Sequence, residues 1–391
     1  MSRNRRIPPL RTLCLRAVGP HGCNPEIEFG DTTSSSTLLR SFHDEAALSR
    51  IPYPESTNKR SNANEVDLVH PFCAERNNGR LVLKNGNVAL DVLQSYLDAM
   101  VELGRLDDTR LGLAFWKEWK YHANTSKSIG PGTSLAALSL HNGSIGERTI
   151  DAMVKAGMGD CLGTLDLTGS HTLTDDVVET LLSHCPHLQR LSLKSCRRLT
   201  NASLRSVVAH CPNLICLDIG GTYNMTIPYI LDSVIPELPL LTELYASGLG
   251  WTDTTLAQLV ALREWTGLGL AFSLVTGGAL RTSLTQCGAT LQRLNIAFCE
   301  AACDSTILGY LGRSLAHLTA LDIRGNNQIL SLTGWFDGRL QIQAEPQGIF
   351  VLARYSGITK QSIEETQRIH PAQAAQLTCI IDANGTGGAI Q

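Results

Sequence analysis

Histidine and cysteine side chains stand close together at two places in this sequence, as they do in zinc sites. His184-Cys185-Pro186-His187 offers two imidazoles and one thiolate, which are groups that bind zinc. A similar segment, His210-Cys211-Pro212-Asn213, lacks the final histidine, and a leucine directly follows each copy. Because the whole segment recurs with its flanking leucine, we interpret both copies as the same joint of a repeated unit. We therefore predict no metal at either position.

Motifs of common catalytic and nucleotide-binding sites are absent from the chain. There is no Gly-x-x-x-x-Gly-Lys-Ser/Thr phosphate loop, no His-Glu-x-x-His zinc motif and no Gly-x-Ser-x-Gly nucleophile elbow. The glycines at 267, 269, 277 and 278 do not have the spacing of a phosphate-binding loop. We therefore predict a protein that is not an enzyme and that carries no cofactor.

A recurring run of leucines sets the position of these histidine and cysteine segments along the chain. Leu188, Leu191 and Leu193 form an L-x-x-L-x-L run, which a cysteine, a helix-capping threonine at 200 and an apolar helical segment follow. The fourth position of the run is occupied, at nearly even spacing, by Leu138, Leu165, Leu191, Leu217, Leu244, Leu268, Leu294 and Leu321. Such self-similarity is typical of a solenoid, in which each unit buries its apolar face against its neighbours. Threonines at 174, 200, 226, 252 and 276 are the expected helix N-caps.

Two stretches, LQRLSLKSCRRLTNASLRSVVAHCPNL and LGTLDLTGSHTLTDDVVETLLSHCPHL, resemble the cysteine-containing class of leucine-rich repeats. The resemblance covers about 134–335 well and 347–383 loosely. It implies an α/β leucine-rich-repeat horseshoe, with a parallel sheet on the concave face and helices on the convex face. This class is best known from F-box/leucine-rich-repeat proteins, the substrate receptors of SCF-type ubiquitin ligases. The resemblance therefore implies recognition of a protein substrate for proteasomal degradation, with a cullin-ligase adaptor as a second partner.

Residues between the leucines of each run should face the concave side, because side chains alternate along a strand. The candidate protein-binding residues on this face are Asp166, Arg190, Ser192, Lys194, Asp218, Glu243, Tyr245, Arg293, Asn295, Asp322 and Arg324. This mixture of charges suits a folded protein or a peptide, with Tyr245 as a large aromatic anchor. The alternative is that these are solvated strand residues. Arg197 and Arg198 extend the basic group on one turn. This turn is either solvated or a docking site for an acidic peptide, a phosphate group or nucleic acid.

The chain divides into five regions by composition. We expect an N-terminal arm over 1–30 with one stray strand-like run, a polar disordered linker over 31–66, a region over 67–128, the repeat array over 129–383 and a flexible tail over 384–391. Within 67–128, apolar spacing predicts an amphipathic helix between 88 and 101, and Leu81-x-Leu83 and Leu111-x-Leu113 resemble strands. The aromatic group at 115–119 favours a cap on the array. This region is a helical cap, a pair of atypical repeats or a degenerate F-box that lacks the usual opening Leu-Pro pair.

Net charge and hydropathy limit the classes of partner and the cellular compartment that we expect. A net charge of −3 argues against nucleic acid, and no apolar run reaches the length of a membrane span. Arginines interrupt the apolar start of the chain, which argues against a secretory signal and leaves a mitochondrial transit peptide as an alternative. We expect an intracellular protein of the cytoplasm or nucleus, with reduced cysteines, acting as a monomer within a complex. A standalone scaffold, or an activator that supplies Arg197 or Arg324 to a partner GTPase, are the alternative functions.

Overall fold

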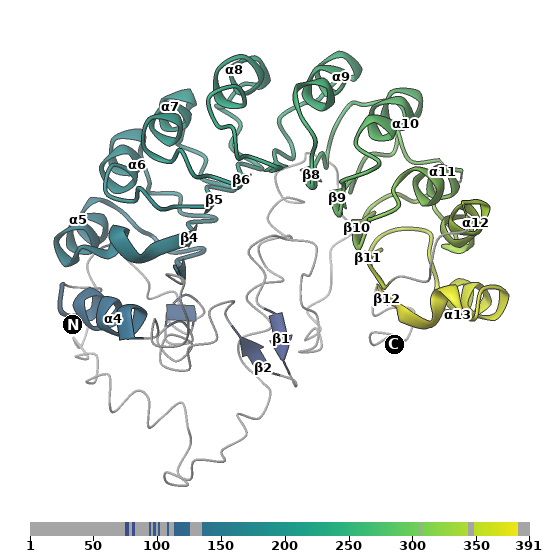
Figure 1. The fold of residues 1–391 in the computed structure, drawn as a ribbon, viewed down its shortest axis with the longest axis horizontal. Coiled ribbons are helices and arrows are strands. Elements are labelled where there is room, and N and C mark those ends of the chain that lie inside the picture. Colours follow the sequence, from purple (N-terminus) through teal and green to yellow (C-terminus); the bar gives the residue numbers. More distant parts are fainter. Residues whose placement is uncertain are drawn as a thin grey trace, which may run out of the picture.

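The computed structural model describes residues 135–304, 306–342 and 348–381, together with 75–77, 80–82, 94, 97–98, 101, 108 and 113–125. The expectations for the N-terminal arm, the polar linker and the C-terminal tail lie outside these residues. Among the described residues, ten parallel strands form one open sheet on the inner side of an arc, and helices form its outer side (Figure 1). The predicted α/β leucine-rich-repeat horseshoe is therefore confirmed.

The strands follow one another in chain order across the sheet. They are β3 Ala136–Ser139, β4 Leu162–Asp166, β5 Arg190–Ser192, β6 Cys216–Asp218, β7 Glu243–Tyr245, β8 Gly267–Gly269, β9 Arg293–Asn295, β10 Ala320–Asp322, β11 Ile349–Leu352 and β12 Leu377–Ile380. The eight predicted leucines pair in one line from Leu138 to Leu321, and Val351 and Cys379 continue this line. The predicted register is therefore correct. A separate antiparallel pair joins β1 Glu75–Asn77 to β2 Arg80–Val82.

Helices connect the strands along the outer side of the arc. They are α5 Glu147–Ala156, α6 Asp175–Leu182, α7 Asn201–His210, α8 Ile227–Tyr229, α9 Asp253–Leu262, α10 Gly277–Gln286, α11 Ile307–Ser314, α12 Thr333–Gln341 and α13 Lys360–Ile369. Two short 3₁₀ helices, η2 Met158–Cys161 and η4 Gln373–Gln376, and one π-helix, η3 Ile230–Val234, complete the outer side. All five predicted threonines occupy N-cap positions. The side chains of Thr200, Thr252 and Thr276 accept a backbone N–H of their own helix. No helix of the described residues combines the length and the apolar character of a membrane span.

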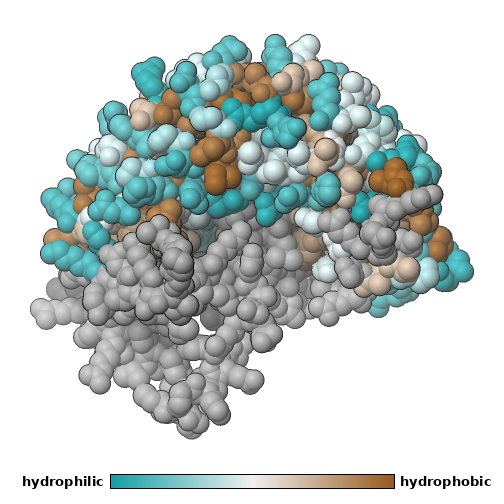
Figure 2. Space-filling view, in the orientation of Figure 1, coloured by the Kyte–Doolittle hydropathy of each residue, from teal (hydrophilic) through white to brown (hydrophobic). Residues whose placement is uncertain are grey.

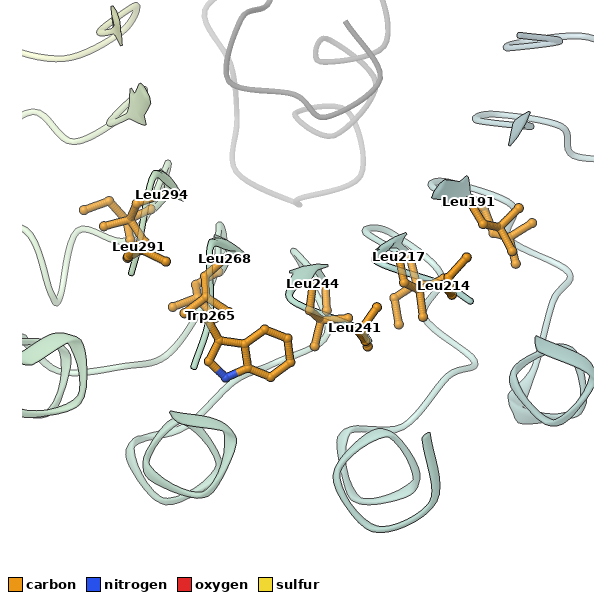
Figure 3. Close-up of a cluster of buried hydrophobic side chains, with 14 of the residues drawn as sticks. Leu191, Leu214, Leu217, Leu241, Leu244, Trp265, Leu268, Leu291 and Leu294 are labelled. Carbon is orange, nitrogen blue, oxygen red and sulfur yellow. The ribbon is translucent and has the colours of Figure 1, made fainter. Parts of the chain in front are cut away.

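The core lies between the sheet and the helices. Figure 3 shows the repeat leucines on the side of the strands that faces the helices, with Trp265 in a leucine position among them. Leu191, Leu217 and Trp265 are fully buried, and each buried leucine contributes roughly 1.5–3 kcal/mol. The nine cysteines of the described residues are buried too, and Cys185 and Cys211 occupy equivalent joints as predicted. On the face seen in Figure 2, hydrophilic residues predominate and hydrophobic ones form small separate groups.

The first edge of the sheet, at β3, is covered by residues that precede the array. The side-chain amide of Gln94 donates to the carbonyl oxygen of Ser139 at 2.8 Å and accepts from its N–H at 3.0 Å, as a neighbouring strand would. The carboxylate of Asp108 accepts three backbone N–H groups at the start of α5. Helix α4, Leu113–Thr125, packs on α5 and η2 and buries Trp116 and Trp119 completely. The prediction of a strand over 111–113 is wrong at its last residue, because Leu113 begins α4.

Candidate functional site

The predicted binding residues lie in three rows across the concave side of the sheet. The strand pairing aligns Thr164, Arg190, Cys216, Glu243, Gly267 and Arg293 in one row, and Asp166, Ser192, Asp218, Tyr245, Gly269, Asn295 and Asp322 in the next. Lys194 and Arg324 follow two residues after the second row, in a third. The sequence therefore placed these residues on one face, and the structure shows which of them meet.

Arg190, Glu243 and Arg293 form one group, which we call the arginine–glutamate cluster. Arg190 donates two hydrogen bonds to the carboxylate of Glu243, at 3.1 and 2.9 Å. Arg293 approaches the same carboxylate from the opposite side, with Nη1 3.1 Å from Oε1. Arg190 reaches Glu243 across strand β6, over Cys216, and Arg293 reaches it across strand β8, over Gly267. Because these two side chains are small, the long arginine side chains can lie over them.

The charges of the arginine–glutamate cluster determine the ionisation of Glu243. Burial alone would raise the pKa of this carboxyl, but the positive charges of Arg190 and Arg293 and the hydrogen bonds from Arg190 and Tyr245 outweigh it, so the pKa lies below its ordinary value. Two guanidinium groups against one carboxylate leave a net charge of +1. The side chain of Glu243 is 6% exposed, whereas those of Arg190 and Arg293 are 17% and 26% exposed. The outward part of the cluster is therefore positive.

Tyr245 lies across strand β8 beside the arginine–glutamate cluster. Its hydroxyl donates to Oε2 of Glu243 at 3.3 Å. A Cβ atom at Gly267 would lie 2.5 Å from this hydroxyl, and one at Gly269 would lie 2.8 Å from the ring. The side chain is 4% exposed, so it does not stand out from the sheet as the expected aromatic anchor would. The two glycines make room for the ring, which is a role that their spacing did not reveal.

The polar side chains of the second row also stabilise the turns that follow the strands, which was not predicted from the sequence. These side chains accept the backbone N–H two residues later, where the strand turns outward, at 2.9 to 3.4 Å; the pairs are Asp166–Thr168, Ser192–Lys194, Asp218–Gly220, Asn295–Ala297 and Asp322–Arg324. Asp, Asn and Ser stabilise turns in this way. The recurrence of these residue types at one position of the repeat was the available signal.

A serine, a histidine and an aspartate meet at the first edge of the sheet, but not as a catalytic triad. Ser139 Oγ donates to Asp166 Oδ2 at 2.9 Å and lies 2.9 Å from His141 Nδ1. In a triad the histidine takes the serine proton and the carboxylate orients the histidine. Here the serine proton is held by the carboxylate, so the serine is not activated. The arrangement is a polar link between β3 and β4.

Asp322 and Arg324 form a separate pair near the other end of the sheet. The guanidinium donates to the carboxylate through Nε at 2.9 Å and Nη2 at 2.6 Å, and Asp322 is fully buried. Arg324 is therefore paired within its own repeat, whereas an activator would have to extend this arginine into a partner's site. Arg197, the other arginine considered for that role, is exposed on the turn after β5.

This chain is similar to known proteins in its structure only. No family model and no curated protein matches the sequence. The solved structures that resemble it include the leucine-rich repeat-containing protein LegL7 from Legionella pneumophila, with 17% identity over 69% of this chain and 89% of that one and a TM-score of 0.44. Rad7 in its complex with Elc1 from yeast has 12% identity over 77% and 87%, with a TM-score of 0.49. An internalin, inlF, of Listeria monocytogenes has 15% identity over 72% and 75%, with a TM-score of 0.34.

Proposed function

We propose that this chain is a leucine-rich-repeat scaffold that binds a protein partner on its concave face. The observation that carries the proposal is the arginine–glutamate cluster, in which one buried carboxylate holds two arginines in place. Side chains that are already ordered lose little conformational entropy on binding, so a fixed guanidinium is a better recognition group than a mobile one. The cluster lies on strands β5 to β9, in the middle of the face.

The charge of the cluster indicates which group of the partner it would bind. Arg293 approaches Glu243 through Nη1, and its side chain is the most exposed of the cluster, at 26%. A carboxylate from the partner would accept hydrogen bonds from the exposed part of this guanidinium in the planar, two-pronged geometry that arginine favours. The partner is therefore a protein that presents an aspartate, a glutamate or its C-terminal carboxylate to the middle of the sheet.

The test is affinity purification from native lysate with quantitative mass spectrometry, comparing Arg293→Met with the unaltered protein. This substitution removes one guanidinium while Arg190 still pairs with Glu243, so the fold should persist. The matched control is Arg205→Met, which removes an exposed arginine on helix α7. We expect partners that Arg293→Met loses and Arg205→Met retains. Identical partner sets for the two variants would contradict binding at the cluster.

A finer proposal is that the partner is a substrate of an SCF-type ubiquitin ligase, which the resemblance of the repeats to F-box/leucine-rich-repeat proteins supports. Leu97 and Trp119, two residues of the F-box-like pattern, are fully buried against the array. We therefore propose a cap over 67–128 in front of an array over 129–383, and an adaptor would need another surface. Recovery of a cullin and its adaptor with the unaltered protein would support the ligase role. Their absence, alongside other partners, would favour a standalone scaffold.

A further inference from the structure

A second row of side chains follows the outer end of the strands, at the turns that lead to the helices. Each turn contains a residue in the left-handed region, with φ between 53° and 76°, at Asn142, Gly169, Ser195, Gly221, Gly248, Phe272, Phe298, Gly325 and Tyr355. In five neighbouring repeats the residue two positions later is exposed and is His171, Arg197, Tyr223, Gly250 or Leu274. We call the last four of these residues, together with Arg198, the turn row.

The turn row is continuous from one repeat to the next. The side-chain amide of Asn224 donates to the carbonyl oxygen of Arg197 at 2.8 Å, which joins the turns after β5 and β6. The ring of Tyr223 lies over Gly248, where a Cβ atom would be 3.5 Å from Cε1. The N–H of Leu274 donates to the carbonyl oxygen of Trp251 at 2.9 Å. The backbone of the row is therefore ordered.

One end of the turn row is basic and has no counter-charge. Arg197 and Arg198 are both exposed, and neither side chain makes an ion pair or a hydrogen bond with any residue in the described part of the chain. By contrast, Arg190, Arg281 and Arg368 each pair with a carboxylate. These two guanidinium groups retain all their donors for a ligand.

The other end of the turn row is apolar. Leu274 is 73% exposed, the highest value among the large hydrophobic residues of the described chain. Tyr223, in the turn after β6 between the two ends, is 48% exposed. Beside Leu274, the rings of Phe272 and Phe298 stack with centroids 4.6 Å apart. Between the two ends, nothing lies within 4 Å of the position that a Cβ atom would take at Gly250, so the surface is open there. Leu274 is therefore the apolar group that this end of the row presents, with the aromatic rings beside it.

We propose that the turn row is a second docking surface, which binds an extended segment of a partner protein that carries acidic residues at one end and large apolar residues at the other. Parallel strands lie about 4.8 Å apart, so the three steps from β5 to β8 separate the two ends by roughly 15 Å. An extended chain rises about 3.3 Å per residue and covers this distance with about five residues. A nucleic acid fits the surface less well, because the positive charge is confined to one repeat and the row ends in leucine.

The experiment is a charge exchange measured by fluorescence anisotropy with the full chain. The probe is a labelled synthetic peptide in which Gly-Ser-Gly separates two glutamates from a leucine–phenylalanine pair, and the comparison peptide has lysines in place of the glutamates. We expect the acidic probe to bind the unaltered protein about tenfold more tightly than the lysine probe. The double variant Arg197→Glu/Arg198→Glu should reverse this preference. Leu274→Ser should weaken both probes about fivefold.

Controls separate this surface from the concave face. Arg205→Glu changes an exposed arginine of the same repeat and should retain the preference for the acidic probe, as should Arg293→Met. Equal binding of the two probes, no binding of either, or a reversal by Arg205→Glu would overturn the proposal. Tighter binding of a twelve-nucleotide oligothymidine than of the acidic probe would overturn it in favour of a nucleic-acid site. Loss of the acidic probe in Arg293→Met would assign the binding to the concave face instead.

Discussion

Arg190 on strand β5 and Glu243 on strand β7 form two hydrogen bonds, 3.1 and 2.9 Å long, across the strand that lies between them. A contact between residues 53 positions apart therefore ties together three consecutive repeats. Arg293 extends the same carboxylate's contacts to β9. In a solenoid each unit otherwise contacts only its neighbours, so the arginine–glutamate cluster adds a longer-range link on the concave side.

Glu243→Gln should destabilise the protein, because it leaves two guanidinium groups beside one another without their counter-charge. Removing one partner of a largely buried ion pair costs a few kcal/mol, and since both arginines are partly exposed we expect a loss of about 1–3 kcal/mol. The free energy of unfolding from urea titrations is the measurement. Glu264→Gln, at an exposed position, is the control and should change it by less than about 0.5 kcal/mol. Equal stability of the two variants would show that the cluster contributes nothing.

Acid should selectively weaken the contribution of Glu243. Because the pKa of this group in the folded protein lies below its ordinary value of 4.5, the stabilisation is fully present above pH 4.5 and is lost as the pH falls through the folded pKa. The difference in unfolding free energy between the unaltered protein and Glu243→Gln should therefore be constant from pH 7 to about pH 5 and shrink at lower pH. A difference that grows on acidification would contradict the assigned ion pairs.

Alanine substitutions at two glycines should have opposite effects. At Gly269 a Cβ atom would lie 2.8 Å from the Tyr245 ring and 2.9 Å from its backbone, so Gly269→Ala should cost about 1–3 kcal/mol. At Gly278, inside helix α10, nothing lies within 4 Å, so Gly278→Ala should stabilise the protein by up to about 1 kcal/mol. Thermal unfolding distinguishes the two directions. Unchanged thermal stability of Gly269→Ala would mean that Tyr245 does not lie against this strand.

Loss of the Asp108 carboxylate should loosen the first helix of the array. The three N–H groups at the start of α5 would lose their acceptor, and Gly146, the N-cap residue, has no side chain to replace it. Asp108→Ala should therefore cost about 1 kcal/mol and speed hydrogen exchange in α5. Asp176→Ala, at an exposed position of α6, is the control. An unchanged rate of hydrogen exchange in α5 would show that Asp108 does not cap this helix.

Most thiols should resist modification until the protein unfolds. Burial raises the pKa of Cys185, Cys211 and Cys379 to about 12, so almost none of each is thiolate at pH 8. Nine of the 12 cysteines are buried in the described residues, which leaves three others. We expect no more than three to react quickly with a thiol reagent in buffer and all 12 to react in denaturant. Rapid reaction of more than three would contradict the packing of the repeat joints.

The sequence by itself determined the strands of the repeat array, their register and the face of the sheet on which their side chains lie. A leucine pattern that recurs at nearly even spacing allows one stacking, because a shift by a single position would turn the leucines to solvent. The leucine pattern therefore places Arg190, Glu243 and Arg293 in one row, and Cys185 and Cys211 at equivalent joints, from the sequence alone. The threonine N-caps followed from the same period.

Only the tertiary structure decided which side chains meet within that face. The pairing of Arg190 with Glu243 depends on the small Cys216 between them, and the position of the Tyr245 ring depends on two glycines of the next repeat. The cover on the first strand depends on Gln94, which lies 45 residues before its partner Ser139. Periodicity specifies the backbone, since every repeat buries the same leucines, whereas these contacts depend on side-chain length and on the free space that neighbouring repeats leave.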